Sequence, residues 1–277
     1  DFSQAAEDAL KLACTVAGTS GAEIYLVNFL EHPFDESFST TGDVNTKYDD
    51  QEKIFTIELI RKSKRQLQEL ADTYRDNATI NFEIFAMDLI DGIEDYIRKE
   101  AIDFIIMGTT GEETAQEFFT GNHTERVIER VNCPVLSLRA GQHETTFDTV
   151  VVGVDYQNDD KANYRAATSY LLDFAEAMGS QLHLVRVSKP NADTSEAEAA
   201  LNEFAEKFHI HNYTKGVQIS KDIEAGLLRS VTSTGAGIVC VLTHHEGGFF
   251  RFFSHSVSED LSKESDVPVL SINLHRV

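Results

Sequence analysis

Three glycines and three polar residues form the part of the sequence best suited to bind phosphate. They are Gly108, Gly111 and Gly121, followed by Asn122, His123 and Thr124. Glycines let the backbone pass close to phosphate oxygens, and the free N–H groups and positive dipole end of a helix stabilise negative charge. Because the apolar run 103–107 precedes Gly108 and a helix is expected to start near Thr124, we predict a strand, a phosphate-binding loop and a helix in this order.

The residues that usually carry out phosphoryl transfer do not accompany these glycines. The sequence around them has no nucleophile elbow, no Walker lysine and no pair of metal-binding carboxylates. We therefore expect a nucleotide to be bound here with at most slow hydrolysis, and we expect no catalytic residue.

Four histidines in the other half of the chain raise a second possibility. His244, His245 and His255 lie near the end of a predicted strand, and His183 lies on a neighbouring one. Grouped imidazoles can hold a transition metal. These histidines lack the tight spacing of a metal site, so the sequence favours hydrogen bonding over metal binding for them.

The elements that position these residues belong to an internal repeat. Residues 132–138 read NCPVLSL and residues 266–272 read DVPVLSI, which places Pro134 and Pro268 in register, 134 positions apart. The same ungapped shift aligns Asp88 with Asp222, Gly92 with Gly226, and Thr109 with Thr243. Upstream, with a different loop length, residues 21–27 align with 179–185. A repeat this long indicates duplication of a whole globular domain.

Strand and helix patterns alternate in the second copy. Strands are predicted at 149–154, 181–187, 212–219, 237–242 and 268–274, and helices at 160–178, 194–208, 222–234 and 255–265. This alternation predicts the α/β class with a parallel sheet covered by helices on both faces. The fold expected for each copy is therefore a doubly wound, Rossmann-like domain.

The first copy shows the same order of elements. Its strands are predicted at 22–29, 79–86, 103–107 and 133–139, with a long helix near 51–75. Asp1 aligns with Asp155, which ends the apolar run 149–154, so an apolar strand is expected ahead of Asp1. We assign domains to 1–140 and 147–277, joined by a linker at 140–147 that lacks apolar periodicity.

The repeat predicts that only the first domain binds a nucleotide. In the second domain Gly108, Gly111 and Gly121 are replaced by Leu242, His245 and His255. These side chains would fill the space that phosphates need, although Asp155 is kept. The second loop is therefore expected to be degenerate.

The glycine spacing, the terminal CPVL sequence and Asp1 together resemble the universal stress protein family over nearly the whole chain. The resemblance implies ATP, with or without Mg²⁺, as the ligand. It further implies that Asp1 receives the adenine or ribose side, that Phe29 packs against adenine and that Met107 precedes the phosphate loop. Asn122 departs from the serine or threonine usual in the family, whereas Thr124 is kept.

The composition limits the partners. The chain has 24 basic and 46 acidic residues, a net charge of −22, which repels nucleic acids and anionic membranes. No apolar run is long enough to span a membrane. The three cysteines are scattered among apolar neighbours and are expected to be reduced, so we expect a cytoplasmic protein.

The leading hypothesis is a cytoplasmic stress-response protein that binds ATP in its first domain. One alternative is a protein-interaction module in which both loops are degenerate, and another is a weak ATP hydrolase. Protein partners or a homodimer are possible. The resemblance also implies that the final strands of the two domains, 133–139 and 268–274, pair antiparallel, which makes an intramolecular pseudo-dimer.

Overall fold

The structure is a computed structural model, and it describes residues 2–30, 50–109, 123–156, 162–243 and 267–277. The chain forms two compact units, which we describe separately. One contains residues 1–3 and 10–102, and the other contains residues 4–9 and 103–277. Helix α1 (Gln4–Ser20) begins in the larger unit, with residues 4–9, and continues in the smaller unit from residue 10.

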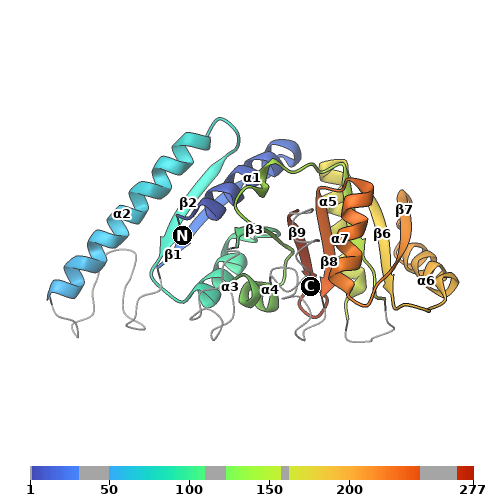
Figure 1. Cartoon of the computed structure of the whole chain (residues 1–277). Helices are drawn as coiled ribbons and strands as arrows, with labels where there is room; N and C mark the ends of the chain where they lie inside the picture. The colour runs from blue at the N-terminus through green and yellow to red at the C-terminus, as the bar shows by residue number, and fades with distance from the viewer. Residues whose placement is uncertain (1, 31–49, 110–122, 157–161, 244–266) are drawn as a thin grey trace. The chain divides into compact units, whose positions relative to one another are not determined.

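The smaller unit is built around a two-stranded parallel sheet (Figure 1). Its further elements are β1 (Ile24–Phe29), α2 (Asp50–Tyr74), β2 (Ile80–Phe85) and α3 (Leu89–Glu100). The register runs from Ile24 opposite Ile80 to Phe29 opposite Phe85. Both strands and the long helix agree with the predicted ranges 22–29, 79–86 and 51–75.

The larger unit contains a seven-stranded sheet with the order β3-β4-β9-β8-β5-β6-β7. Its strands are β3 (Ile105–Gly108), β4 (Val135–Leu138), β5 (Thr149–Gly153), β6 (Gln181–Ser188), β7 (Tyr213–Ile219), β8 (Ile238–Thr243) and β9 (Val269–Asn273). Its helices are α4 (His123–Arg130), the short η2 (Gln142–Glu144), α5 (Tyr164–Met178), α6 (Thr194–Lys207) and α7 (Ile223–Thr234). The helix predicted at 255–265 lies outside the described residues.

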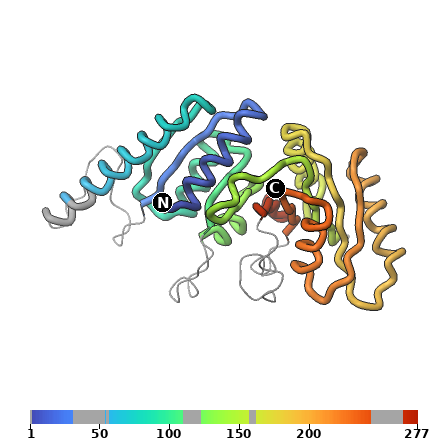
Figure 2. Tube along the Cα trace, turned by 45° about the horizontal axis from the view of Figure 1, so that its top comes forward, coloured from blue at the N-terminus to red at the C-terminus, as the bar shows by residue number. Residues whose placement is uncertain are grey.

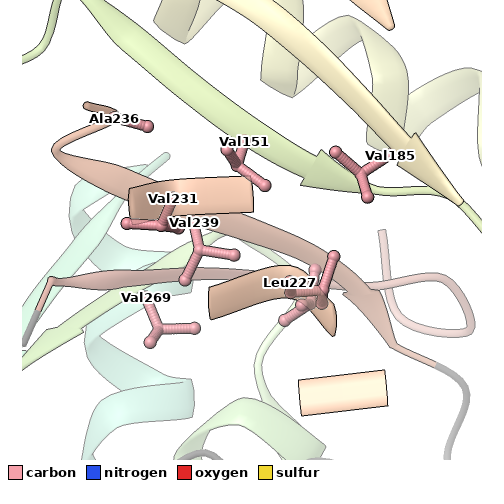
Figure 3. Close-up of a cluster of buried hydrophobic side chains, with 8 residues drawn as sticks. Val151, Val185, Leu227, Val231, Ala236, Val239 and Val269 are labelled. Atoms are coloured by element: carbon pink, nitrogen blue, oxygen red, sulfur yellow. The ribbon is translucent and has the colours of Figure 1, made fainter. Parts of the chain in front are cut away.

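The core of the second domain confirms the doubly wound arrangement. Helix α7 packs on one face of the sheet through Leu227 and Val231, which meet Val151, Val185 and Val239 (Figure 3). Side chains of a strand alternate between its two faces, so Val150 and Val152 point to the opposite face. All three valines of β5 are fully buried, which is the burial expected of a parallel strand covered on both sides.

The aligned landmarks of the repeat have matching structural roles. Asp88 and Asp222 are the N-caps of α3 and α7; the side chain of Asp88 accepts hydrogen bonds from two backbone N–H groups of the first turn, and that of Asp222 accepts one. Ile105 N and Val239 N donate to the carbonyl oxygens of Pro134 and Pro268 in the same way, at 3.0 and 3.2 Å. The duplication inferred from the sequence is therefore present in the hydrogen bonds as well.

The two domains join through the predicted antiparallel pair of final strands. Strand β9, coloured red in Figures 1 and 2, pairs with β4 so that Leu136 lies opposite Leu270. These two leucines are equivalent in the repeat, so a residue pairs with its own counterpart and a pseudo-twofold axis passes between them. Both are fully buried. The predicted intramolecular pseudo-dimer is confirmed.

Candidate functional site

Strand β3 and helix α4 carry the described part of the predicted phosphate segment. Met107 and Gly108 end β3 and lie opposite Ser137 and Leu138 of β4 in a parallel ladder. Both residues are half-buried. The strand–helix order predicted around these residues is thus observed, although β3 starts two residues later and ends one residue later than the predicted range 103–107.

Close packing alone requires a glycine at position 108. A Cβ atom at this residue would lie 2.4 Å from the carbonyl carbon of Ala5 and 2.7 Å from the backbone nitrogen of Ala6. Such distances are far below normal contact, and backbone atoms cannot rotate away. The first turn of α1 therefore approaches β3 at a place that only glycine allows.

Helix α4 begins at the residues predicted to follow the loop. His123 is its first residue and is exposed, whereas Thr124 is buried in its first turn, 3% exposed. Thr124 is held by further interactions and belongs to the buried side of α4 with Val127 and Ile128. Asp1, Gly111, Gly121 and Asn122 lie outside the described residues.

Phe29, the residue implied to pack against adenine, ends β1 in the smaller unit. Its ring stacks on Phe85 of β2, with centroids 5.3 Å apart. It also lies over Gly92 of α3, where a Cβ atom would come within 2.3 Å of the Phe29 ring. Gly92 thus makes room for a large aromatic side chain at the carboxyl end of β1.

In the second domain, a glycine of the equivalent helix also packs against the end of the equivalent strand, where the side chain is smaller. Gly226 of α7 faces Val187, and a Cβ atom there would lie 2.7 Å from the valine Cγ1. Val187 is the counterpart of Phe29, because residues 21–27 align with 179–185. The aligned glycines Gly92 and Gly226 therefore fit the helix against the strand end, a role that the sequence alone did not reveal.

An ion pair distinguishes the end of β5 in the second domain. Asp155 follows the strand and lies 3.5 Å from the guanidinium of Arg186 on β6, with the carboxylate side chain 68% exposed. The counterpart of Arg186 in the first domain is Asn28, a neutral side chain on β1. The acid kept in the second domain thus has a cationic neighbour, and the shift that aligns Gly21 with Gly179 would have identified Arg186.

Asn28 itself is buried, 5% exposed. Its Oδ1 finds no hydrogen-bond partner among the described residues. A buried amide oxygen without a partner costs free energy. Asn28, beside Phe29 at the carboxyl end of β1, was not identified by the sequence reasoning.

His183 is the one member of the predicted histidine group that lies in the described part of the chain. Its Nδ1 is 2.7 Å from the hydroxyl of Thr214 on β7, and its Nε2 faces Gly216, where a Cβ atom would be 3.1 Å away. Burial lowers the pKa of His183, which favours the neutral ring. His244, His245 and His255 lie outside the described residues.

Within the described ranges, no three His, Cys, Asp or Glu side chains gather where they could hold a metal ion. Cys14, Cys133 and Cys240 are free and buried. Burial, with a smaller effect of Asp103, raises the pKa of Cys133 to about 12, which keeps this thiol protonated. Across the described helices, none is both long and apolar enough to cross a membrane.

Comparison with known sequences identifies the class of protein. The profile of the universal stress protein family matches residues 1–139 and again residues 146–273. The chain therefore belongs to the universal stress protein family, with two such domains in tandem. A universal stress protein of Methanocaldococcus jannaschii is 36% identical over 52 residues, a match that spans 19% of this chain and 31% of the relative's length.

Solved structures show the same fold. A universal stress protein from Archaeoglobus fulgidus superposes with a TM-score of 0.70 at 18% identity, over 99% of this chain and 94% of its own. The cytoplasmic domain of a prokaryotic cation chloride cotransporter superposes with a TM-score of 0.51 at 12% identity, over 92% and 97% of the two chains. At these identities the similarity concerns the fold alone.

Proposed function

We propose that the first domain binds ATP in the cytoplasm as part of a stress response, with the phosphates at the segment between β3 and α4. The observation that carries this proposal is the order of elements. β3 ends at Gly108 and α4 begins at His123, so the glycine-containing segment connects a strand end to a helix start, in a chain of the universal stress protein family. N–H groups at a helix start favour phosphate.

Differences between the two domains support nucleotide binding by the first domain only. Leu242 occupies the position of Gly108 at the end of the equivalent strand, and Arg186 pairs with Asp155 where the first domain has Asn28. A leucine side chain takes up space near the strand end, and the ion pair engages the acid. We therefore assign ATP, with or without Mg²⁺, to the first domain only.

Calorimetric titration with Mg-ATP tests this assignment. Gly111→Val should abolish binding, because a β-branched side chain intrudes where phosphate oxygens approach the backbone. His245→Val is the matched control, since it places the same side chain at the equivalent position of the second domain and should leave binding unchanged. Equal affinities of the wild type and Gly111→Val, both folded by circular dichroism, would remove the loop from the proposal.

A second candidate function, a protein-interaction module without nucleotide, gains support from Gly108. Packing against the Ala5 backbone explains this glycine without a ligand. Asn122 in place of the family's serine or threonine points in the same direction. Mass spectrometry of the denatured purified protein separates the two functions, because released adenine nucleotide is expected only for the first.

A further inference from the structure

The last residues of the second domain form hydrogen bonds to the last turn of α4 in the first domain. Asn273 ends β9 and is buried, and its Nδ2 donates to the carbonyl oxygens of Ile128 at 3.1 Å and Glu129 at 3.4 Å. Its Oδ1 accepts from the N–H of His275 at 3.0 Å. Arg276 adds a hydrogen bond from Nε to the Glu129 carbonyl, also at 3.0 Å.

Helix α4 needs such contacts because of its length. The last four carbonyl groups of any helix have no partner inside it. The eight described residues of α4 are fewer than the roughly 12 that an isolated helix needs for marginal stability. Val127 and Ile128 are buried, and the second domain supplies donors to the carbonyl groups at the end of the helix.

We propose that Asn273 is a positioning residue for phosphate binding, through which the second domain fixes α4 in place. The inference rests on the proposed function, because the segment that contains Gly111 and Gly121 leads into the first residue of α4. When the end of α4 loses its partners, the helix frays or shifts, and the N–H groups at its start lose their alignment. The second domain thus contributes to ATP binding without a loop of its own.

Asn273→Asp tests the proposal in the full chain. The substitution replaces an N–H₂ donor by a carboxylate oxygen that faces two carbonyl oxygens, and it adds negative charge at the helix end that disfavours it. We expect calorimetry to show a dissociation constant for ATP about tenfold higher, the equivalent of one or two lost hydrogen bonds. The constant for adenosine should not change, because adenosine has no phosphate.

Two further variants keep the test decisive. Arg276→Ala removes one exposed donor to the Glu129 carbonyl and should weaken ATP binding by about twofold to threefold without risk to folding. Asn163→Asp is the matched control. Its Nδ2 also donates to a backbone carbonyl, that of Val277 at 3.0 Å, but within the second domain, so ATP affinity should be unchanged.

Hydrogen exchange gives a readout that needs no nucleotide. In Asn273→Asp the amides of α4 should exchange faster than in the wild type, whereas those of α7 should not. Unchanged exchange together with unchanged ATP affinity overturns the inference and leaves the proposed function intact. A parallel loss of ATP and adenosine binding also overturns it, because this outcome indicates general unfolding. A wild type that binds neither ligand contradicts the proposed function, and the inference falls with it.

Discussion

Strands β3 and β8 hold the same position in the two domains but are buried to different degrees. Ile238, Val239 and Cys240 of β8 are fully buried. Their counterparts in the first domain are Phe104, Ile105 and Ile106, and all three are half-buried. β8 lies between β9 and β5, whereas within the described residues β3 pairs with β4 only.

The difference between these strands shows that neighbours, and not only the strand's own residues, decide its burial. β3 is as apolar as β8, and its ladder to β4 is formed. Its second edge has no partner among the described residues, and its isoleucines are half-buried. Within the described residues β1 likewise pairs with β2 only, whereas its counterpart β6 pairs with β5 on one side and β7 on the other.

We expect the largest change in stability when Gly108, at the end of β3, is replaced by the leucine that the second domain has at the equivalent position. Gly108→Leu copies Leu242, but its Cβ atom would lie 2.4 Å from the Ala5 backbone. We expect a loss of about 3 kcal/mol or more, measured by urea unfolding, because overpacking against a backbone cannot be relieved by rotation of a side chain. Gly18→Ala, whose Cβ atom would have its nearest neighbour 3.9 Å away, is the control and should not destabilise the fold, because alanine is the better helix former in α1.

Alkaline pH should destabilise the first domain through Tyr96, a titratable group whose equivalent position in the second domain holds a serine. Tyr96 of α3 is buried, and burial together with Glu83 and Glu100 raises its pKa to about 12, whereas its counterpart in α7 is Ser230. A raised pKa means that the protonated ring stabilises the fold below pH 10 and that this contribution is lost as the pH rises to 12. Tyr96→Phe should flatten the dependence of unfolding free energy on pH in this window, and an unchanged slope would contradict the assignment.

The smallest expected effect concerns the ends of α3 and α7. Ala101 and Gly235 are equivalent C-caps, and both adopt the left-handed conformation, with φ of 53° and 65°. Alanine pays about 1 kcal/mol for this conformation and glycine does not. Ala101→Gly should therefore stabilise the protein by about 1 kcal/mol, and Gly235→Ala should destabilise it by a similar amount. Chemical unfolding measures the stability of both variants. If the two substitutions both raise or both lower the free energy of unfolding, the two C-caps are not equivalent.

The fold was largely predictable because the duplication shows the sequence pattern of most helices and strands twice. Asp88 and Asp222 aligned in sequence and proved to be equivalent caps, and the shared Pro-Val-Leu-Ser runs located the paired final strands. Contacts between distant residues were harder to predict. Nothing in the spacing of Asn273 indicates that its amide reaches Ile128, and Gly108 gave no sign of its approach to Ala5, because both depend on how separate elements pack.

The strand pair around Leu136 and Leu270 also bears on how the molecule can evolve. In a homodimer of identical single domains, any substitution near the axis would appear on both sides at once, and association would weaken on dilution. Joined in one chain, the two halves meet at any protein concentration, and each side mutates alone. Arg139 and Asn273 occupy equivalent positions three residues after the leucines and differ, so the two sides of the strand pair can make different contacts.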